Sequence, residues 1–121
     1  MQLVSYYLEF MDKEILFKLA ELIEERRSSS RENSYVKSLL EDGTKKINEK
    51  IFEEALELIE AASEEGSSKK KKVIHETADL WFHTIVLLSS EGIRIEEILK
   101  ELEDRFGISG LDEKSSRDLE Q

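Results

Sequence analysis

Residues 74–88 read IHETADLWFHTIVLL and form the least polar stretch of a very polar chain. The spacing of its apolar residues predicts an α-helix, because residues three or four apart share one face at about 100° per residue. Three polar side chains, Glu76, Asp79 and His83, share that face with Leu80 and Leu87. We therefore expect the two acids to be held away from water, where a carboxylate is paired, protonated or bound to a cation.

A second group of acids lies in the preceding predicted helix, where residues 50–57 read KIFEEALE. Glu54 and Glu57 are three residues apart, as are Glu76 and Asp79, so each pair shares one helix face. If the two helices pack antiparallel, the four carboxylates converge across their interface. Oxygen-rich sites suit hard divalent cations, so the sequence predicts Mg²⁺ at this position, with Mn²⁺ as the alternative.

Simpler interpretations exist for these acids. Glutamates at positions 53, 57, 60 and 64 lie on one side of the third helix, which is typical of an ordinary solvated face. Glu76 and Asp79 could instead pair with Arg or Lys from another helix, since structural ion pairs also hold acids in apolar places. Only the combination with Glu54 and Glu57 favours a metal site over a structural pair.

The basic and imidazole groups nearby have their own interpretations. We interpret His83 as a core histidine with satisfied hydrogen bonds, the alternative being a contact that orients a carboxylate. His75 and His83 are two helical turns apart and project from different sides, so they make a poor chelating pair. The run of lysines at residues 69–72 is interpreted as a solvated loop.

Composition favours one all-α domain. The 121 residues include no proline and only five glycines, which favours long helices over a turn-dense sheet protein. We expect a single-domain bundle of four to five helices over residues 1–121, with its core at about 12–106 and a C-terminal tail at 107–121. Because 28 acidic residues outnumber 18 basic ones, the net charge of −10 disfavours binding to nucleic acid or to an anionic membrane.

The compartment follows from what the sequence lacks. The absence of cysteine excludes disulfide and thiolate chemistry and fits a reducing cytosol. No apolar run approaches the ~20 residues needed to cross a bilayer. The first ten residues carry no basic segment of the kind that begins a signal peptide. We therefore expect a soluble, cytoplasmic protein.

Helix boundaries are predicted from capping residues and glycines. The first helix is expected over residues 12–27 with Asp12 as its N-cap, followed by a serine-rich linker at 28–33. A short connector helix should cover residues 34–40. Thr44 is expected to cap the third helix, which ends at 65, and Gly92 should close the fourth. A fifth helix is predicted at 95–106.

The acid spacing also carries a family resemblance. The pattern Glu53-Glu54-x-x-Glu57 followed by Glu76-x-x-Asp79 resembles the metal-binding signature of the all-α nucleoside triphosphate pyrophosphatases, the MazG-like superfamily. Within it, the Ser34-Tyr35 element and SGLDEKSSR at 109–117 are similar to the phosphoribosyl-ATP pyrophosphohydrolase family, over about residues 12–117. The chain departs from that pattern at two positions: Ser38 stands where a lysine is usual, with Lys37 beside it, and Phe52 where a small residue is usual.

The resemblance implies hydrolysis of phosphoribosyl-ATP to phosphoribosyl-AMP and pyrophosphate, the second step of histidine biosynthesis, with Mg²⁺. It implies metal ligands at Glu54, Glu57, Glu76 and Asp79, and Glu53 as a general base or an outer residue of the site. Basic positions of the family that would stabilise charge or bind phosphate match this sequence at Lys50, Arg26, Lys114 and Arg117. An intertwined homodimer is also implied, as a stand-alone enzyme without a fused cyclohydrolase.

Two alternative functions stay open at this point. A related house-cleaning pyrophosphatase would use the same carboxylates on ordinary or damaged dNTPs, and the motif at 109–117 argues against it. A non-enzymatic helical dimerisation module would leave the acids solvated or paired, and the expected embedding of Glu76 and Asp79 argues against that.

Overall fold

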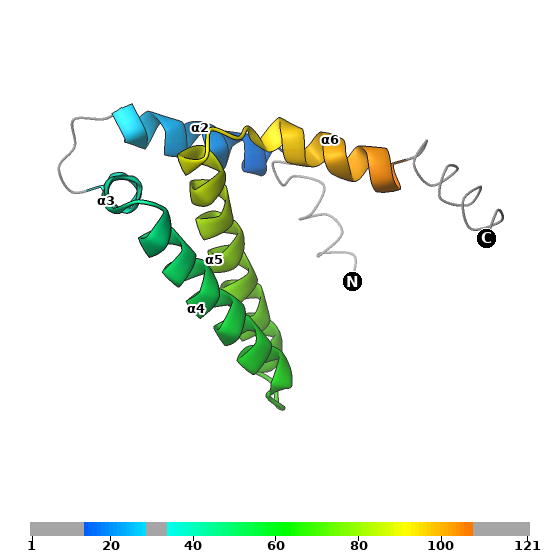
Figure 1. The fold of residues 1–121 in the computed structure, drawn as a ribbon. Coiled ribbons are helices and arrows are strands. Elements are labelled where there is room, and N and C mark those ends of the chain that lie inside the picture. The colour runs from blue at the N-terminus through cyan, green and yellow to red at the C-terminus, as the bar shows by residue number, and fades with distance from the viewer. Residues whose placement is uncertain (1–13, 29–33, 108–121) are drawn as a thin grey trace.

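The computed structural model describes residues 14–28 and 34–107, and within these ranges the chain is all-α, with no strand. Its helices are α2 (Ile15–Ser28), α3 (Tyr35–Asp42), α4 (Thr44–Ser63), α5 (Lys69–Ser90) and α6 (Ile95–Phe106), as Figure 1 shows. The predicted all-α class is thus confirmed. None of the described helices combines the length and the apolar character that crossing a membrane requires.

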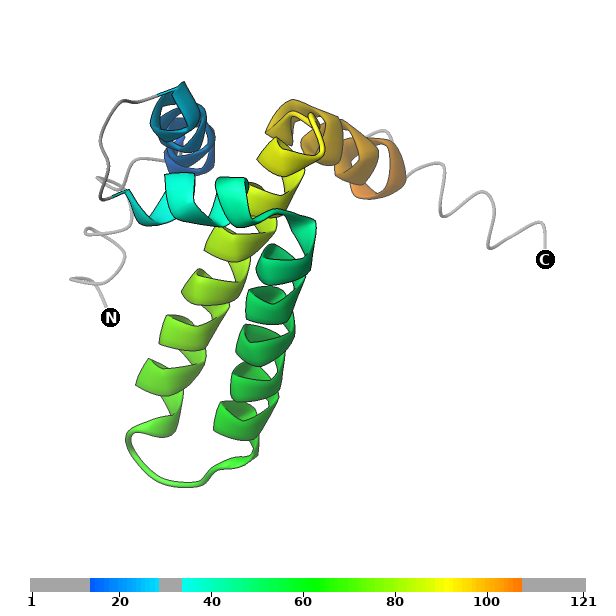
Figure 2. The same ribbon diagram turned by 60° about the vertical axis from the view of Figure 1, so that its left-hand side comes forward.

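The two longest helices, α4 and α5, form an antiparallel hairpin (Figure 2). Residues 64–68 connect them, and Gly66 has a φ of +109°, which a residue with a side chain rarely adopts. This short connection forces the chain to reverse and brings α5 back along α4. The antiparallel packing on which the convergence of the carboxylates depends is therefore present.

The hydrophobic core lies at one end of this hairpin, where α2 and α3 cross it (Figures 1 and 2). Each of the four helices contributes an aliphatic side chain that is at most 2% exposed: Ile23 from α2, Leu39 from α3, Ile47 from α4 and Val86 from α5. Burial of each such side chain stabilises the fold by about 1.5–3 kcal/mol. The core thus fixes the end of the hairpin at which α4 begins and α5 ends.

The helix boundaries confirm some predicted caps and correct others. Ser34 caps α3, because its Oγ accepts a hydrogen bond from the backbone N–H of Lys37 at 3.3 Å. The prediction that Thr44 caps the next helix is wrong: Gly43 is the cap residue, and Thr44 is already helical. Gly43 has a φ of +92°, which lets the chain turn from α3 into α4 within one residue. The proposed cap Asp12 lies outside the described residues.

The interpretation of residues 69–72 as a loop is also wrong. These four lysines are exposed and form the first turn of α5. Lys72 Nζ donates a hydrogen bond to Glu64 Oε2 at 2.7 Å, so its charge meets the C-terminal end of α4. A cationic first turn is unfavourable for the helix dipole, which is why the sequence pattern did not indicate a helix start here.

Candidate metal centre

Three carboxylates meet across the α4–α5 hairpin. One oxygen from each of Glu54, Glu57 and Glu76 lies within 4.8 Å of the others. Glu54 and Glu57 are one turn apart on α4, and Glu76 projects from α5 opposite them. The spacing of the acids and the antiparallel packing together produce the predicted convergence for these three side chains.

Asp79 lies at the edge of this cluster. One ligand atom each from His75, Glu76 and Asp79 also lies within 4.8 Å of the others, so Glu76 belongs to both groups. Asp79 Oδ2 is 3.2 Å from His75 Nε2, and the Asp79 side chain is 40% exposed. Asp79 is therefore paired, as one of the expected outcomes, but it is only partly held away from water. The sequence interpretation did not consider His75 as a partner of the acids, although its spacing of four residues from Asp79 indicates one.

The cluster carries more negative charge than its surroundings neutralise. The Glu54 side chain is only 12% exposed. Glu54 Oε2 and Glu76 Oε2 are buried and have no hydrogen-bond partner. Burial, followed by the neighbouring carboxyls of Glu76, Asp79 and Glu57, raises the pKa of Glu54 to about 7. Unpartnered, buried carboxylate oxygens directed at one another are the donor set that a hard divalent cation fits.

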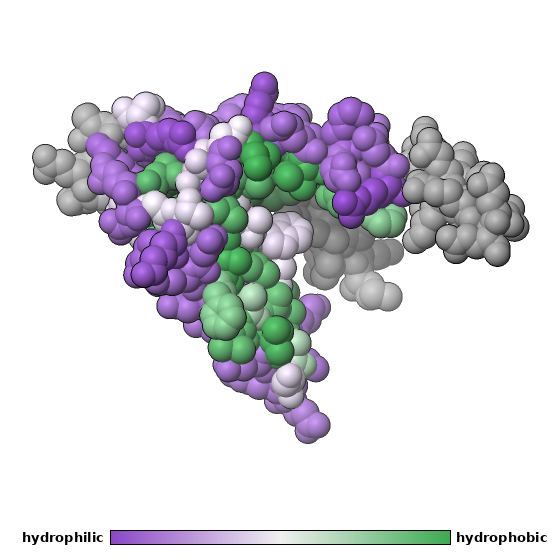
Figure 3. All heavy atoms as spheres, viewed as in Figure 1, coloured by the Kyte–Doolittle hydropathy of each residue, from purple (hydrophilic) through white to green (hydrophobic). Residues whose placement is uncertain are grey.

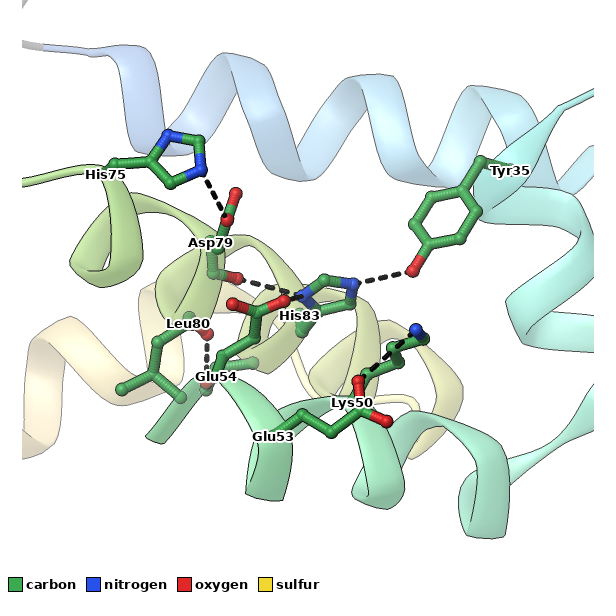
Figure 4. Close-up of polar contacts among 9 residues, drawn as sticks. Tyr35, Lys50, Glu53, Glu54, His75, Asp79, Leu80 and His83 are labelled. Atoms are coloured by element: carbon green, nitrogen blue, oxygen red, sulfur yellow. Dashed lines mark hydrogen bonds and ion pairs between the residues drawn. The ribbon is translucent and has the colours of Figure 1, made fainter. Parts of the chain in front are cut away.

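His83 lies directly behind Glu54, as Figure 4 shows. It is 5% exposed, and both ring nitrogens are engaged: Nε2 lies 2.8 Å from the Tyr35 hydroxyl, and Nδ1 lies 3.0 Å from the backbone oxygen of Asp79. The interpretation as a satisfied core histidine is confirmed. The alternative contact is present as well, since Nδ1 lies 3.9 Å from Glu54 Oε1.

Lys50 and Glu53 lie on α4 beside the cluster (Figure 4). Lys50 Nζ is 3.4 Å from Glu53 Oε2, and the hydrogen bond and charge of Glu53 raise the pKa of Lys50. Both side chains are partly solvent-accessible. Phe52, which stands where the family pattern has a small residue, is 71% exposed and does not crowd the carboxylates.

The predicted substrate-binding residues lie elsewhere in the chain. Arg26 is on α2 and is partly buried. Lys114 and Arg117 lie outside the described residues. A hollow of about 470 Å³ lies where α2, the C-terminal end of α5 and the start of α6 meet. None of the clustered carboxylates lines it, so we place the site by its chemistry, at the carboxylates, and not by the size of this hollow.

The raised pKa of Glu54 predicts how the stability of the metal-free protein depends on pH. The folded protein binds the Glu54 proton up to about pH 7, whereas the unfolded chain releases it near 4.5. The stabilisation from that proton is complete below the lower value and is lost as the pH rises through the higher one. We expect the free energy of unfolding to fall by on the order of 2 kcal/mol between pH 5 and pH 8 from this group.

Glu54→Gln should remove most of that fall, because the amide has no proton to lose. Urea unfolding of chelator-treated protein at several pH values measures the effect. Glu60→Gln is the matched control, since it deletes one charge at an exposed position of the same helix. If both variants show the same pH dependence as the wild type, the buried cluster does not control it.

The fold and site define an all-α protein whose central antiparallel hairpin presents a carboxylate cluster suited to a divalent cation. Residues 16–106 match the profile of one family, described as phosphoribosyl-ATP pyrophosphohydrolase, and the chain belongs to this family. The resemblance stated from the sequence is thus confirmed.

Individual relatives agree with the family match. The chain is 50% identical to the phosphoribosyl-ATP pyrophosphatase of Vesicomyosocius okutanii over 104 residues, which are 86% of this chain and 96% of that protein. It is 49% identical to the phosphoribosyl-ATP pyrophosphatase of Nitrosospira multiformis over 106 residues, or 88% of this chain and 85% of that one. A protein of the same name from Hydrogenovibrio crunogenus is 44% identical over 108 residues.

Proposed function

We propose that this chain hydrolyses phosphoribosyl-ATP to phosphoribosyl-AMP and pyrophosphate, the second step of histidine biosynthesis. Membership of the family supports the reaction. The observation that carries the proposal is the cluster of Glu54, Glu57 and Glu76, two of which present buried oxygens without a partner. Glu57 is exposed, but a protein that used Glu54 and Glu76 only as part of a solvated face would not bury their oxygens unpaired.

Mg²⁺ is the cation that we propose for the cluster, with Glu54, Glu57, Glu76 and Asp79 as its ligands and Mn²⁺ as a substitute. The oxygen donors of these four acids support this choice, since oxygen ligands favour Mg²⁺. When bound, Mg²⁺ would neutralise phosphate charge and lower the pKa of the attacking water.

Glu53 and Lys50 are proposed as the residues that act directly on the substrate. Glu53 is about half exposed, so its carboxylate can accept a proton from a water molecule above the cluster. Lys50, held beside it at 3.4 Å, can donate to a phosphate oxygen as negative charge develops there. Arg26, Lys114 and Arg117 are proposed to bind the substrate phosphates, which a strongly acidic site otherwise repels.

The direct test is pyrophosphate release from phosphoribosyl-ATP compared with a panel of dNTPs, with Mg²⁺ and with chelator. We expect the protein to hydrolyse phosphoribosyl-ATP but none of the dNTPs, and to do so only when Mg²⁺ is present. Faster hydrolysis of a dNTP would instead support the house-cleaning function. Absence of turnover on every nucleotide would contradict an enzymatic role and support a dimerisation module.

We further propose that the protein forms an intertwined homodimer. Large apolar side chains are exposed on one face of α4, at Phe52, Leu56 and Ile59, and on one face of α5, at Ile74 and Trp81. Figure 3 shows apolar residues gathered along the hairpin.

A second exposed apolar stripe lies on α6. It includes Ile98 and Leu102, which are four residues apart and therefore lie on one helix face. α6 extends away from the hairpin in Figure 1, and Ile98 and Leu102 are 38% and 48% exposed. Exposed apolar surface on this scale is typical of an interface, and exchange of α6 between two copies would cover both surfaces.

A further inference from the structure

Tyr35 reaches the carboxylate cluster through one intermediary, His83. The Tyr35 hydroxyl belongs to the first residue of α3, and it contacts His83 Nε2 of α5 at 2.8 Å. On the other side of the ring, His83 Nδ1 lies 3.9 Å from Glu54 Oε1 of α4. Figure 4 shows the three side chains in this order. Three helices therefore meet along one line that ends at a proposed metal ligand.

The hydrogen bonds along this line determine which ring nitrogen of His83 carries the proton. The backbone oxygen of Asp79, 3.0 Å from Nδ1, can only accept, so Nδ1 must carry a hydrogen. In a neutral imidazole, Nε2 is then an acceptor, and the Tyr35 hydroxyl must donate to it. Burial is the first cause that raises the pKa of Tyr35, so its hydroxyl keeps the proton that it donates.

Packing holds both rings in place. Phe82 stacks on Tyr35 with ring centroids 6.4 Å apart and meets His83 edge to face at 5.2 Å. The Ser34 cap fixes the start of α3, from which the Tyr35 side chain projects. With these contacts, the Nδ1 edge of the imidazole faces the Glu54 carboxylate, whose nearest oxygen is 3.9 Å away and whose side chain is only 12% exposed.

We propose that Tyr35 is a positioning residue, which fixes the orientation of the His83 ring from its Nε2 side so that the ring keeps Glu54 directed at Glu57 and Glu76. This inference deepens the proposed function and rests on it. Neither Tyr35 nor His83 needs to touch the cation or the substrate for this role. Replacing a residue that orients a metal ligand without touching the metal typically lowers metal affinity on the order of 10-fold or more.

The test is Tyr35→Phe, which keeps the ring and its packing but removes the donor. Nitrogen-15 NMR of the His83 side chain should show one Nδ1–H tautomer in the wild type and, in the variant, a displaced Nε2 signal, because that nitrogen has lost its donor. Calorimetric titration with Mg²⁺ alone should show affinity reduced on the order of 10-fold. At saturating Mg²⁺, the KM for phosphoribosyl-ATP should stay near the wild-type value. Ser63→Ala is the matched control, since it removes an exposed hydroxyl from the far end of α4.

A second variant separates positioning from general structure. His83→Asn retains an N–H donor near the place of Nδ1 but lacks the Nε2 acceptor. If Tyr35 acts through His83, adding Tyr35→Phe to His83→Asn should cause no further loss of Mg²⁺ affinity. An unchanged His83 spectrum, unchanged Mg²⁺ affinity in Tyr35→Phe, or additive losses would each overturn the proposal. The spectrum and the Mg²⁺ titration need no turnover, so a failure of the proposed reaction would be seen separately.

Discussion

Replacing Glu57 with Gln is expected to lower the kcat for pyrophosphate release by about 1,000-fold or more. The change keeps the shape of the side chain but removes one of the three charges that converge across the hairpin. Loss of a ligand charge removes several kcal/mol of transition-state stabilisation where the cation must offset phosphate charge. Asp79→Asn should have the same effect, although Asp79 lies at the exposed edge of the cluster. Steady-state assays with phosphoribosyl-ATP measure both variants.

Two controls make this result specific. Glu60→Gln removes an exposed charge from the same helix and should leave the rate unchanged. Thermal unfolding should show that Mg²⁺ stabilises the wild type more than Na⁺ does at matched ionic strength, since the proposed site exists only in the folded protein. Glu76→Gln should abolish that difference. Activity of Glu57→Gln within a few-fold of wild type would contradict the assignment of the cluster as the metal site.

The second large effect concerns the proposed dimer. Trp81 is 55% exposed on α5, and replacing it with Glu would place a charge on the apolar face of the hairpin. We expect the dimer dissociation constant to rise on the order of 1,000-fold, because an aromatic anchor is lost and a carboxylate is buried without a partner. Sedimentation velocity over a range of protein concentrations would measure the change.

Ile15→Glu provides the matched control for the dimer. Ile15 is also 55% exposed, but it lies on α2, away from the face formed by α4 and α5. The same change of charge there should leave association unaltered. A wild-type chain that sediments as a monomer at all concentrations, or a Trp81→Glu variant that associates normally, would contradict an interface on this face.

Much of the fold could be predicted from the sequence because its signals are local. The last helix, α6, begins at residue 95 and ends at residue 106, as predicted. The order of the helices and the reversal at Gly66 follow from apolar spacing and from a glycine where the chain must turn. The start of α5 was missed because its first turn is cationic, against the usual preference of a helix N-terminus.

The candidate site could be predicted only as far as helix periodicity extends. The convergence of Glu54, Glu57 and Glu76 follows from spacings of three residues and one assumption about packing. The exposure of Asp79 could not be derived, since it depends on how much of α5 its neighbour covers. The contact of Tyr35 with His83 joins residues 48 positions apart, and no periodic pattern within one helix indicates such a pair.

The position of the core along the hairpin has a consequence for how the protein opens locally. Most of the buried residues of α4 and α5 lie near the crossing with α2 and α3, and Ala61 is the only buried residue in the second half of α4. Local protection against amide hydrogen exchange should therefore decline from that crossing toward residues 64–68. The carboxylates lie part of the way along this gradient. Local unfolding of the hairpin from residues 64–68 would separate Glu57 from Glu76 while the core stays folded. Binding of the cation would therefore favour the closed hairpin.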